Sequence, residues 1–508
     1  VLGAAGVFLL VFPLNYLVGR DWIPPDDQGE LMASLNLPEG TSLEATARAT
    51  AELAQKVAAL KGVDFVNPYV HEAAVAGHSH IYVKLVDLGK RDFTNLDAAA
   101  EVRKLCAAVP NLRYKVIIPS ALGGGENFFP IRALVLGPDF NEVVRLAKES
   151  AARIRRIDGL TDVDTSVSVN SPELEVKIDR QRASDLGVRA SDVGNAVRLM
   201  IAGEDQISTY KEGDEQYDVT LQLLPEQQKN PEILARLAIP SSKIGQVRLD
   251  NIASIERGVG PARIERYNRQ FQVQIYANNA PSFPLDAAAR AAGDEIRKVG
   301  LPPGYNFKFT GSVKILDETT RNLIIAFLLA SIFMYMVLAA QFDSFLHPFT
   351  IMLSLPLAIP FALFSLWITG RTLNLWSSLG VLLLLGIVKK NGILQVDYTN
   401  KLREEGMTLR EAILQANHVR LRPILMTTLA IVAGLIPTAL GIGAGSAQRS
   451  AVAVTIIGGQ MLCLLPTLLI TPVAYSLLAE AEIRGIRFGP SWLGRLWDTV
   501  RPEALRRQ

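Results

Sequence analysis

Apolar residues follow two different patterns along this chain. From residue 321 onward they form five runs of about 20 residues that carry little charge, at 322–340, 348–369, 373–396, 423–442 and 451–478. An α-helix rises about 1.5 Å per residue, so a run of this length crosses the ~30 Å hydrocarbon core of a bilayer. The pattern therefore predicts a membrane α-helical bundle with five complete spans within residues 321–479.

A sixth apolar run opens the chain at residues 1–19. It lacks the basic n-region and the small-residue cleavage site of a secretory signal peptide. We therefore expect a truncated transmembrane helix here.

Basic residues mark the predicted cytoplasmic side, because short cytoplasmic loops are enriched in Lys and Arg. Five of them lie between the runs 373–396 and 423–442, and six arginines follow residue 480. The opposite loops carry only Arg371 and Arg449. This asymmetry predicts a cytoplasmic basic tail at 480–508 and places residues 20–320 outside the cytoplasm.

Shorter patterns fill residues 20–320, where strand-like alternation and helix-like periodicity take turns. The first set predicts β-α-β-β-α-β at 30–37, 42–60, 63–70, 80–86, 96–109 and 112–118, which is the ferredoxin-like split βαβ order. A second set begins at 131–136, 141–157, 161–167 and 173–178, and it is completed by 270–276, 285–299 and 306–310. The prediction is therefore a large α+β domain built from two similar subdomains.

The predicted boundaries place the first subdomain at 20–122 and the second at 123–190 and 256–320. Residues 191–255, with one helix and several short strands, interrupt the second and are interpreted as an inserted module. Two tandem copies of one architecture suggest a cleft between them that could grip a ligand. A rigid external domain without a ligand remains the alternative.

Composition excludes several classes of function. A net charge of +2 gives no reason to expect nucleic-acid binding, and two cysteines, Cys106 and Cys463, cannot form a disulfide framework. His78 and His80 make a His-x-His pair without a third metal ligand nearby, and Met32 and Met200 are far apart in sequence. We find no nucleophile–base pair, so the sequence predicts no enzyme, no resident metal and no cofactor.

Lys389 and Lys390 interrupt the apolar run 373–396. A charge in hydrocarbon costs at least ~2.5 kcal/mol on insertion scales, so such a lysine normally faces a polar partner. Lys390 lies seven residues from Asp397, and Thr427 lies seven residues from Arg420, which predicts that lysine, arginine and threonine converge at one depth. Lys389 better fits a side chain that reaches toward the headgroups. The five long runs contain no Asp or Glu, so a buried Lys390 requires a carboxylate from elsewhere.

Three membrane motifs occur in order: Gly-Ile-Val-Lys-Lys-Asn-Gly-Ile-Leu at 386–394, Arg-Leu-Arg-Pro-Ile-Leu-Met-Thr at 420–427, and Gly-Ala-Gly-Ser at 443–446. With Asp26 to Gly29 and Ile-Glu-Arg-Tyr-Asn at 264–268, they resemble the resistance-nodulation-division (RND) efflux pumps of the hydrophobe/amphiphile, acriflavine-resistance-like type. The likeness is to the C-terminal half of those pumps only. It implies a secondary transporter that exports amphiphilic small molecules by proton antiport.

The resemblance implies proton-relay roles for Lys390, Asn391, Arg420 and Thr427, with two aspartates in the N-terminal half as their partners. It also implies porter subdomains in the external repeats, a docking module at 191–255, a homotrimer, a periplasmic adaptor and an outer-membrane channel. The expected location is the inner membrane of a Gram-negative bacterium, in contact with membrane lipid.

The loop 67–79 falls where this family has a Phe-rich switch loop. Tyr69, His71 and Tyr82 stand where the family has Phe, and they are candidates for the substrate path. Their polar groups weaken the expectation of a purely lipophilic substrate. Two alternatives stay open: a sensor or scaffold whose external domain binds lipid or protein, and a metal-ion exporter of the same fold.

Overall fold

A computed structural model of the chain describes residues 2–483, except residues 25, 39, 71–76, 120–128, 168–170, 204–205, 229 and 262. The chain forms two compact units. One unit joins Val1–Ser166 to Ile264–Gln508, and the other is Val167–Arg263.

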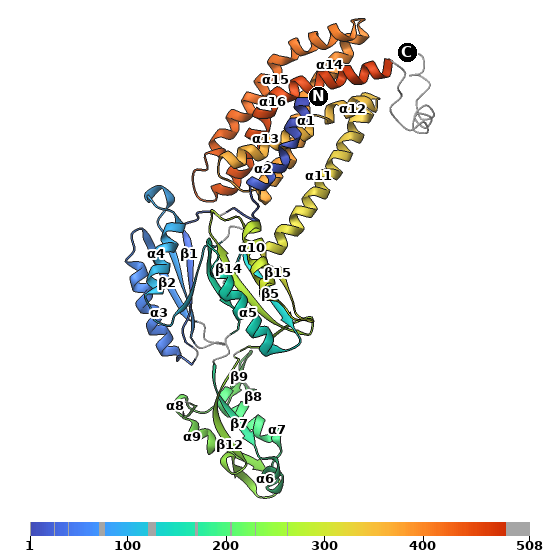
Figure 1. The fold of residues 1–508 in the computed structure, drawn as a ribbon. Coiled ribbons are helices and arrows are strands. Elements are labelled where there is room, and N and C mark those ends of the chain that lie inside the picture. Colours follow the sequence, from blue (N-terminus) through green and yellow to red (C-terminus); the bar gives the residue numbers. More distant parts are fainter. Residues whose placement is uncertain are drawn as a thin grey trace. The chain divides into compact units, whose positions relative to one another are not determined.

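Within the described residues, the larger unit contains five helical segments that are long and apolar enough to cross a membrane, which confirms the predicted number (Figure 1). They are α11 (Ser312–Phe342), the pair α12 (Leu346–Met352) and α13 (Leu355–Ile368), α14 (Leu375–Glu404), α15 (Leu409–Ala439) and α16 (Ser446–Ile483). Two shorter helices, α1 (Leu2–Leu9) and α2 (Val11–Leu17), form the opening apolar segment. Helices α11 and α15 each begin in polar sequence ahead of the apolar run and continue into it.

Helix α16 packs closely against α13 and α14 through two adjacent glycines. A Cβ atom at Gly458 would lie 2.1 Å from Cβ of Ser365 in α13, and one at Gly459 would lie 2.3 Å from a methyl carbon of Leu384 in α14. Ser365 Oγ also donates to the carbonyl oxygen of Val454, 3.1 Å away. Because glycine has no Cβ atom, these two positions allow α16 to approach α13 and α14 closely.

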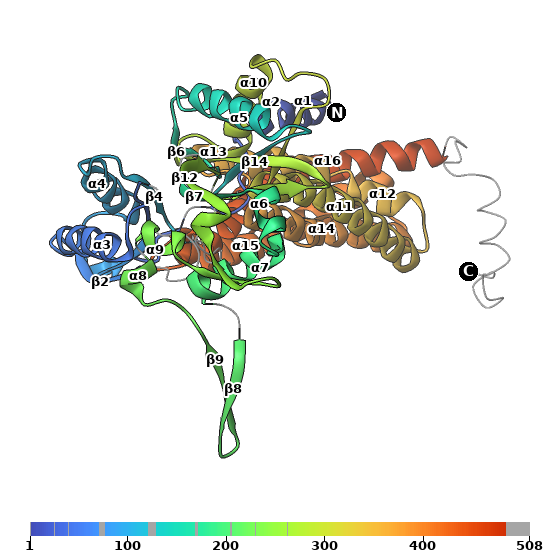
Figure 2. The ribbon, with the colours of Figure 1, turned by 90° about the horizontal axis from the view of Figure 1, so that it is seen from below.

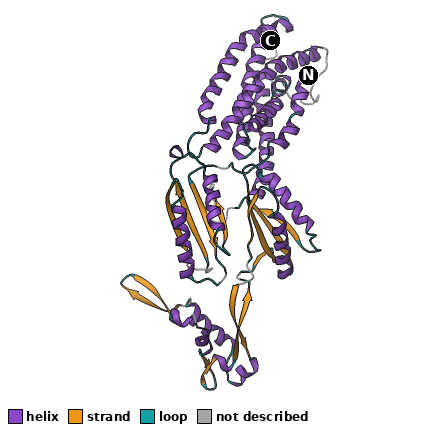
Figure 3. Cartoon of the chain, turned by 60° about the vertical axis from the view of Figure 1, so that its left-hand side comes forward, coloured by secondary structure: helices purple, strands orange, loops and turns teal. Residues whose placement is uncertain are grey.

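The first sheet contains β1 (Glu30–Asn36), β2 (Val63–Val70), β3 (His78–Leu85) and β4 (Arg113–Ile117), in the antiparallel order β2-β3-β1-β4. Helices α3 (Leu43–Ala58) and α4 (Asn95–Ala107) follow β1 and β3, with the short 3₁₀ helix η1 (Leu88–Lys90) before α4. Figure 3 shows helices, in purple, lying beside the orange strands of the α+β region. Leu31, Ala33 and Leu35 of β1 are buried in a core with α3 and α4. Side chains alternate along a strand, so the even-numbered residues of β1 lie on the opposite face of the sheet, where Ser34 is also buried.

A second sheet has the order β13-β14-β5-β15, and β6 also pairs with β14. Its strands are β5 (Ile131–Gly137), β6 (Leu160–Thr165), β13 (Glu265–Tyr267), β14 (Gln270–Asn279) and β15 (Asn306–Thr310), with helices α5 (Phe140–Ile154) and α10 (Leu285–Lys298). The expectation that residues 173–178 form a strand of this sheet is wrong. That segment belongs to β7 (Ser171–Ile178), which pairs with β12 (Ala253–Gly260) in the smaller unit.

The smaller unit therefore runs from Val167 to Arg263, beyond the 191–255 expected for the insertion. Its core includes the buried Ile239, Leu249 and Ile252. Two hairpins belong to it, and β8 with β9 is the longer (Figure 2). Its remaining elements are α6 (Arg180–Asp185), α7 (Ala190–Val197), a π-helical turn (Arg198–Ala202), β8 (Gln206–Glu212), β9 (Glu215–Thr220), α8 (Pro225–Gln228), α9 (Pro231–Ala235), β10 (Ala238–Ser241), β11 (Gly245–Arg248) and the 3₁₀ turn Leu249–Asn251.

Both cysteines are free thiols in buried positions. Cys106 lies in α4 and Cys463 in α16.

Candidate functional site

The lysine pair of α14 points in two directions. Lys389 is 1% exposed, and its Nζ donates to the carbonyl oxygen of Ile351, 2.9 Å away, and to Oγ of Ser354, 3.3 Å away. Both acceptors lie where α12 ends and α13 begins. Lys390 is exposed in this chain.

In this chain the buried lysine is Lys389, against the expectation that it reaches toward the headgroups. Successive helical residues are rotated by about 100°, so neighbours in sequence lie on different faces. Lys389 shares its face with the buried Leu385 and Val396, whereas Lys390 shares its face with the exposed Gly386 and Asp397. The described part of α14 thus exposes the charged side chains of Lys390 and Asp397 on one face.

The other relay candidates make contacts of their own. Asn391 is buried in α14. The Arg420 guanidinium lies over the ring of Tyr398, 4.6 Å from its centroid, and Thr427 Oγ1 donates to the carbonyl oxygen of Ile424, 3.1 Å away. Among the described residues no hydrogen bond or ion pair joins Lys390, Arg420 and Thr427.

Two of the predicted substrate-path residues lie on the face of the first sheet opposite α3 and α4. The Tyr69 ring stacks on His80, with ring centroids 4.9 Å apart, and its hydroxyl lies 3.5 Å from Sδ of Met32. Tyr82 pairs with Met32 in the register of β1 and β3. The third candidate, His71, lies outside the described residues.

The two histidines of the His-x-His pair also lie on β3. Their ring centroids are 4.5 Å apart, and Nδ1 of His78 is hydrogen-bonded to Oδ1 of Asn36. No cluster of three or more His, Cys, Asp or Glu side chains occurs within the described part of the chain. The thioether of Met32 nevertheless comes close to this face, which the spacing in sequence did not reveal.

A cavity of about 360 Å³ lies between the two sheets. Its walls include Leu96 and Ile117 from the first sheet and its helices, and Thr161 and Asn278 from the second. Two ion pairs join the two sheets and their helices beside this cavity. Arg103 reaches Asp162 at 3.1 Å, where Asp162 is nearly buried, and Arg113 reaches Asp164 at 2.7 Å.

A second cavity, of about 410 Å³, is an apolar groove among α2, α11, α13 and α14. Phe12, Leu323 and Phe327 contribute to its apolar wall, and Arg20 and Trp22 lie at the end of the helices next to the α+β region. The Arg20 guanidinium donates to Oδ1 of Asn15, 2.9 Å away. The groove therefore combines an apolar body with a polar rim.

A sequence model of the AcrB/AcrD/AcrF family matches residues 1–479. This range is most of the 508-residue chain. The chain belongs to the AcrB/AcrD/AcrF family. This is a family of RND efflux transporters.

Two solved structures of a heavy metal efflux pump resemble this RND chain in fold. Crystal form II has a TM-score of 0.79 and 23% identity, and the alignment covers 94% of this chain and 50% of the pump chain. Crystal form I gives 0.78 and 22%, with 93% and 49% covered. The chain thus spans about half the length of those pump chains, and at this identity the likeness concerns the fold and not the substrate.

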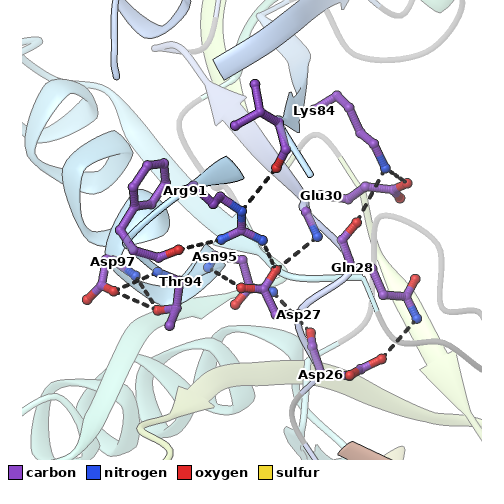
Figure 4. Close-up of polar contacts among 12 residues, drawn as sticks. Asp26, Asp27, Gln28, Glu30, Lys84, Arg91, Thr94, Asn95 and Asp97 are labelled. Carbon is purple, nitrogen blue, oxygen red and sulfur yellow. Dashed lines mark hydrogen bonds and ion pairs between the residues drawn. The ribbon is translucent and has the colours of Figure 1, made fainter. Parts of the chain in front are cut away.

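In this RND chain the motif from Asp26 to Gly29 lies in the segment between α2 and β1. Figure 4 shows the polar contacts of Asp26 and Asp27. Asp27 accepts hydrogen bonds from the backbone N–H groups of Gly29 and Asn95, each 2.9 Å away, and forms an ion pair with the buried Arg91. Asp26 accepts a long hydrogen bond of 3.4 Å from the backbone N–H of Ala447, at the start of α16. The motif therefore contacts the N-terminal ends of α4 and α16.

Burial alone would raise the pKa of Asp27. The hydrogen bond from Arg91 and those from the two backbone N–H groups outweigh this effect, so the pKa of Asp27 lies below its usual value. Asp27 is therefore ionised at neutral pH and can hold the Arg91 guanidinium.

Proposed function

We propose that this chain is the C-terminal half of a proton-driven RND efflux transporter that exports amphiphilic small molecules. The apolar groove beside α11 is the observation that favours this substrate class. It holds 410 Å³, enough for a small apolar molecule, and its polar rim suits a head group. A hydrated metal ion has no need for such a groove.

The exposed lysine of α14 supports proton coupling. A cation that faced acyl chains at this depth would be unfavourable by several kcal/mol, so another protein segment is expected to cover this face. Carboxylates from the N-terminal half would complete the ion pairs of Lys390. Asn391, Arg420 and Thr427 would then join the relay as those helices pack together.

In the proposed mechanism, protonation of those carboxylates removes the negative charge that holds Lys390. Two helix arrangements then alternate, one for each protonation state. The link to the external domain is short, because Leu375 at the start of α14 donates its backbone N–H to Trp22 at 3.2 Å. Asp21, next to Trp22, accepts from the backbone N–H of Leu285, 2.8 Å away at the start of α10.

The same proposal covers the larger assembly. The two sheets would be ferredoxin-like porter subdomains, with the substrate passing along Tyr69, His71 and Tyr82. The smaller unit would dock with an outer-membrane channel. A homotrimer in the inner membrane and a periplasmic adaptor would complete the envelope complex.

Replacing Lys390 with Ala in the complete transporter tests the coupling. We expect proton-driven export to fall to background while folding and ligand binding persist, because only the switching charge is removed. Dye transport is measured under a defined pH gradient, in whole cells or in inside-out membrane vesicles. The matched control is Lys401→Ala, also exposed on α14 but in the predicted cytoplasmic turn, and export by the Lys390→Ala variant at the parent rate would refute the proposed relay.

A metal-ion exporter is the second candidate. His78, His80 and Met32 share one sheet face, and nitrogen and thioether ligands suit soft and borderline metals. The printed names of the two structural neighbours refer to heavy metals. If the intact pump protects cells against Cu⁺ or Zn²⁺, His80→Ala removes that protection, and the parent transporter exports no dye, this candidate replaces the first.

A further inference from the structure

A third cavity, of about 460 Å³, is lined by α10, by the first turns of α11 and by the segment that follows α2. We call it the basic cavity, because its charged lining residues are the four cations Arg20, Arg290, Arg297 and Lys314 and the two acids Asp286 and Asp317. The cations outnumber the acids, so the lining favours an anionic ligand.

Asp286 fixes one wall of the basic cavity. Its Oδ1 accepts from the backbone N–H of Arg20, 3.0 Å away, and its own backbone N–H donates to the carbonyl oxygen of Arg20 at 3.1 Å. Its Oδ2 pairs with Arg290 at 3.0 Å. The carboxylate is therefore shared, whereas the Arg290 side chain is 64% exposed and carries further N–H donors for a ligand.

The other cations pair with acids of their own helices. Arg297 lies 2.7 Å from Asp294 in α10, and Lys314 lies 3.6 Å from Glu318 in α11. Both basic side chains are largely exposed, and exposed pairs of this kind contribute little to stability. A phosphate forms stronger charge-assisted hydrogen bonds, so it can draw these side chains toward itself.

The depth of the basic cavity matches that of lipid headgroups. The apolar run of α11 begins at residue 322, and the cavity is lined by the helical residues just before it, from Val313 to Thr320. A headgroup layer is about 5–8 Å thick on each side of the hydrocarbon core, which corresponds to about four or five helical residues. The long side chain of Lys314 can extend into this layer from one turn farther away.

The basic cavity is also continuous with the apolar groove among α2, α11, α13 and α14. Arg20, Leu316 and Thr320 line both of them. From there the groove follows α11 past Leu323 and Phe327. A molecule with a phosphate at one end and an apolar chain at the other would therefore contact cations and apolar side chains at the same time.

We propose that the basic cavity binds the phosphate of an anionic phospholipid, phosphatidylglycerol, whose acyl chains lie along the apolar groove. Arginine binds phosphate through two parallel N–H donors, and lysine binds it as a point charge. This lipid site does not depend on the proposed export function, because a resident lipid need not be transported.

The competing interpretation is that these cations only stabilise α10 and α11 through their ion pairs. Helix pairing would be insensitive to the charge of added lipid. A headgroup site, in contrast, distinguishes an anionic lipid from a zwitterionic one with the same acyl chains.

The test titrates the purified complete transporter with single lipids in detergent and counts bound lipid by native mass spectrometry. We expect phosphatidylglycerol to bind at least fivefold more tightly than phosphatidylcholine with identical acyl chains. Arg290→Gln and Lys314→Gln should each weaken phosphatidylglycerol binding about fivefold, which is the usual contribution of one basic residue near anionic lipid. Binding of phosphatidylcholine should not change.

Lys298→Gln is the matched control, because Lys298 is an exposed cation of α10 that pairs with Glu295 but does not line the basic cavity. Glycerol 3-phosphate, which has the phosphate without acyl chains, should bind far more weakly than the lipid. Equal phosphatidylglycerol binding by the control and both test variants, or equal affinity of the parent for the two lipids, would overturn the site. Glycerol 3-phosphate binding as tight as that of phosphatidylglycerol would overturn the lipid as its ligand.

Discussion

Asp27 and Arg91 show how one pair of side chains stabilises the start of the α+β region. The Arg91 side chain is 1% exposed, and it also donates to the carbonyl oxygens of Val86 and Phe93, at 3.1 and 2.7 Å. A guanidinium in this position has little access to water, so it relies on Asp27 for its counter-charge. Removing one partner of a buried pair leaves the other charge uncompensated.

Asp27→Asn should therefore destabilise the chain by about 3 kcal/mol, because Arg91 loses its counter-charge. Urea unfolding of the purified protein measures the change, and the double variant with Arg91→Met should recover part of the loss. The control is Asp92→Asn, since Asp92 pairs with Lys61 on the open surface. An Asp27→Asn variant as stable as that control would show that the pair contributes nothing.

The same carboxylate gives a pH signature. Its pKa is lowered in the folded state, so its contribution is complete above the ordinary value near 3.8 and is lost as the pH falls toward the lower folded value. Between pH 5 and 3 the difference in stability between parent and Asp27→Asn should shrink. Hydrogen exchange at the Gly29 and Asn95 amides reports this loss locally.

At the scale of elements, the contact of α16 with α13 and α14 depends on glycines. Gly458→Ala should destabilise the bundle by about 1–3 kcal/mol, because its Cβ would overlap Ser365. Gly434→Ala in α15 is the matched control, since a Cβ there meets nothing within 4 Å in this chain and alanine favours the helix. Thermal unfolding in detergent should separate the two variants, and equal melting temperatures would contradict the proposed packing.

The sequence was a good guide to elements whose pattern is local. The apolar runs predicted five spans because length and composition alone decide whether a helix can cross a bilayer. The partner of β7 could not be predicted, because an alternating strand has the same pattern whichever sheet it joins. The burial of Lys389 was missed for a related reason: the sequence gives the angle between adjacent lysines but not which side the other helices cover.

At the scale of the whole molecule, the ion pairs between the two sheets would control opening of the cavity between them. The sequence predicted a cleft from the repeats, but it could not identify Arg103 and Asp162 as partners, because they are distant in sequence and meet only after both subdomains fold. Asp162 also accepts from Nδ2 of Asn278, 2.9 Å away, so it is well fixed in the second sheet.

Arg103→Gln should widen the distribution of distances between the two subdomains, because a neutral amide holds Asp162 more weakly. Spin labels at Lys56→Cys in α3 and Lys148→Cys in α5 allow the distance to be measured by pulsed electron resonance. Lys104→Gln is the control, since Lys104 pairs with Glu101 within α4. Identical distributions in Arg103→Gln and the control would show that the ion pair does not restrain the cleft.

The buried position of both cysteines makes such labelling practical. Burial raises the pKa of the Cys106 thiol to about 12, so the reactive thiolate is scarce at neutral pH, and Cys463 is enclosed within the bundle. With 2 cysteines in the whole chain, maleimide reagents should react with newly introduced surface thiols and spare the native ones. The wild-type chain is thus a ready background for site-specific fluorophores, without prior removal of its own sulfhydryls.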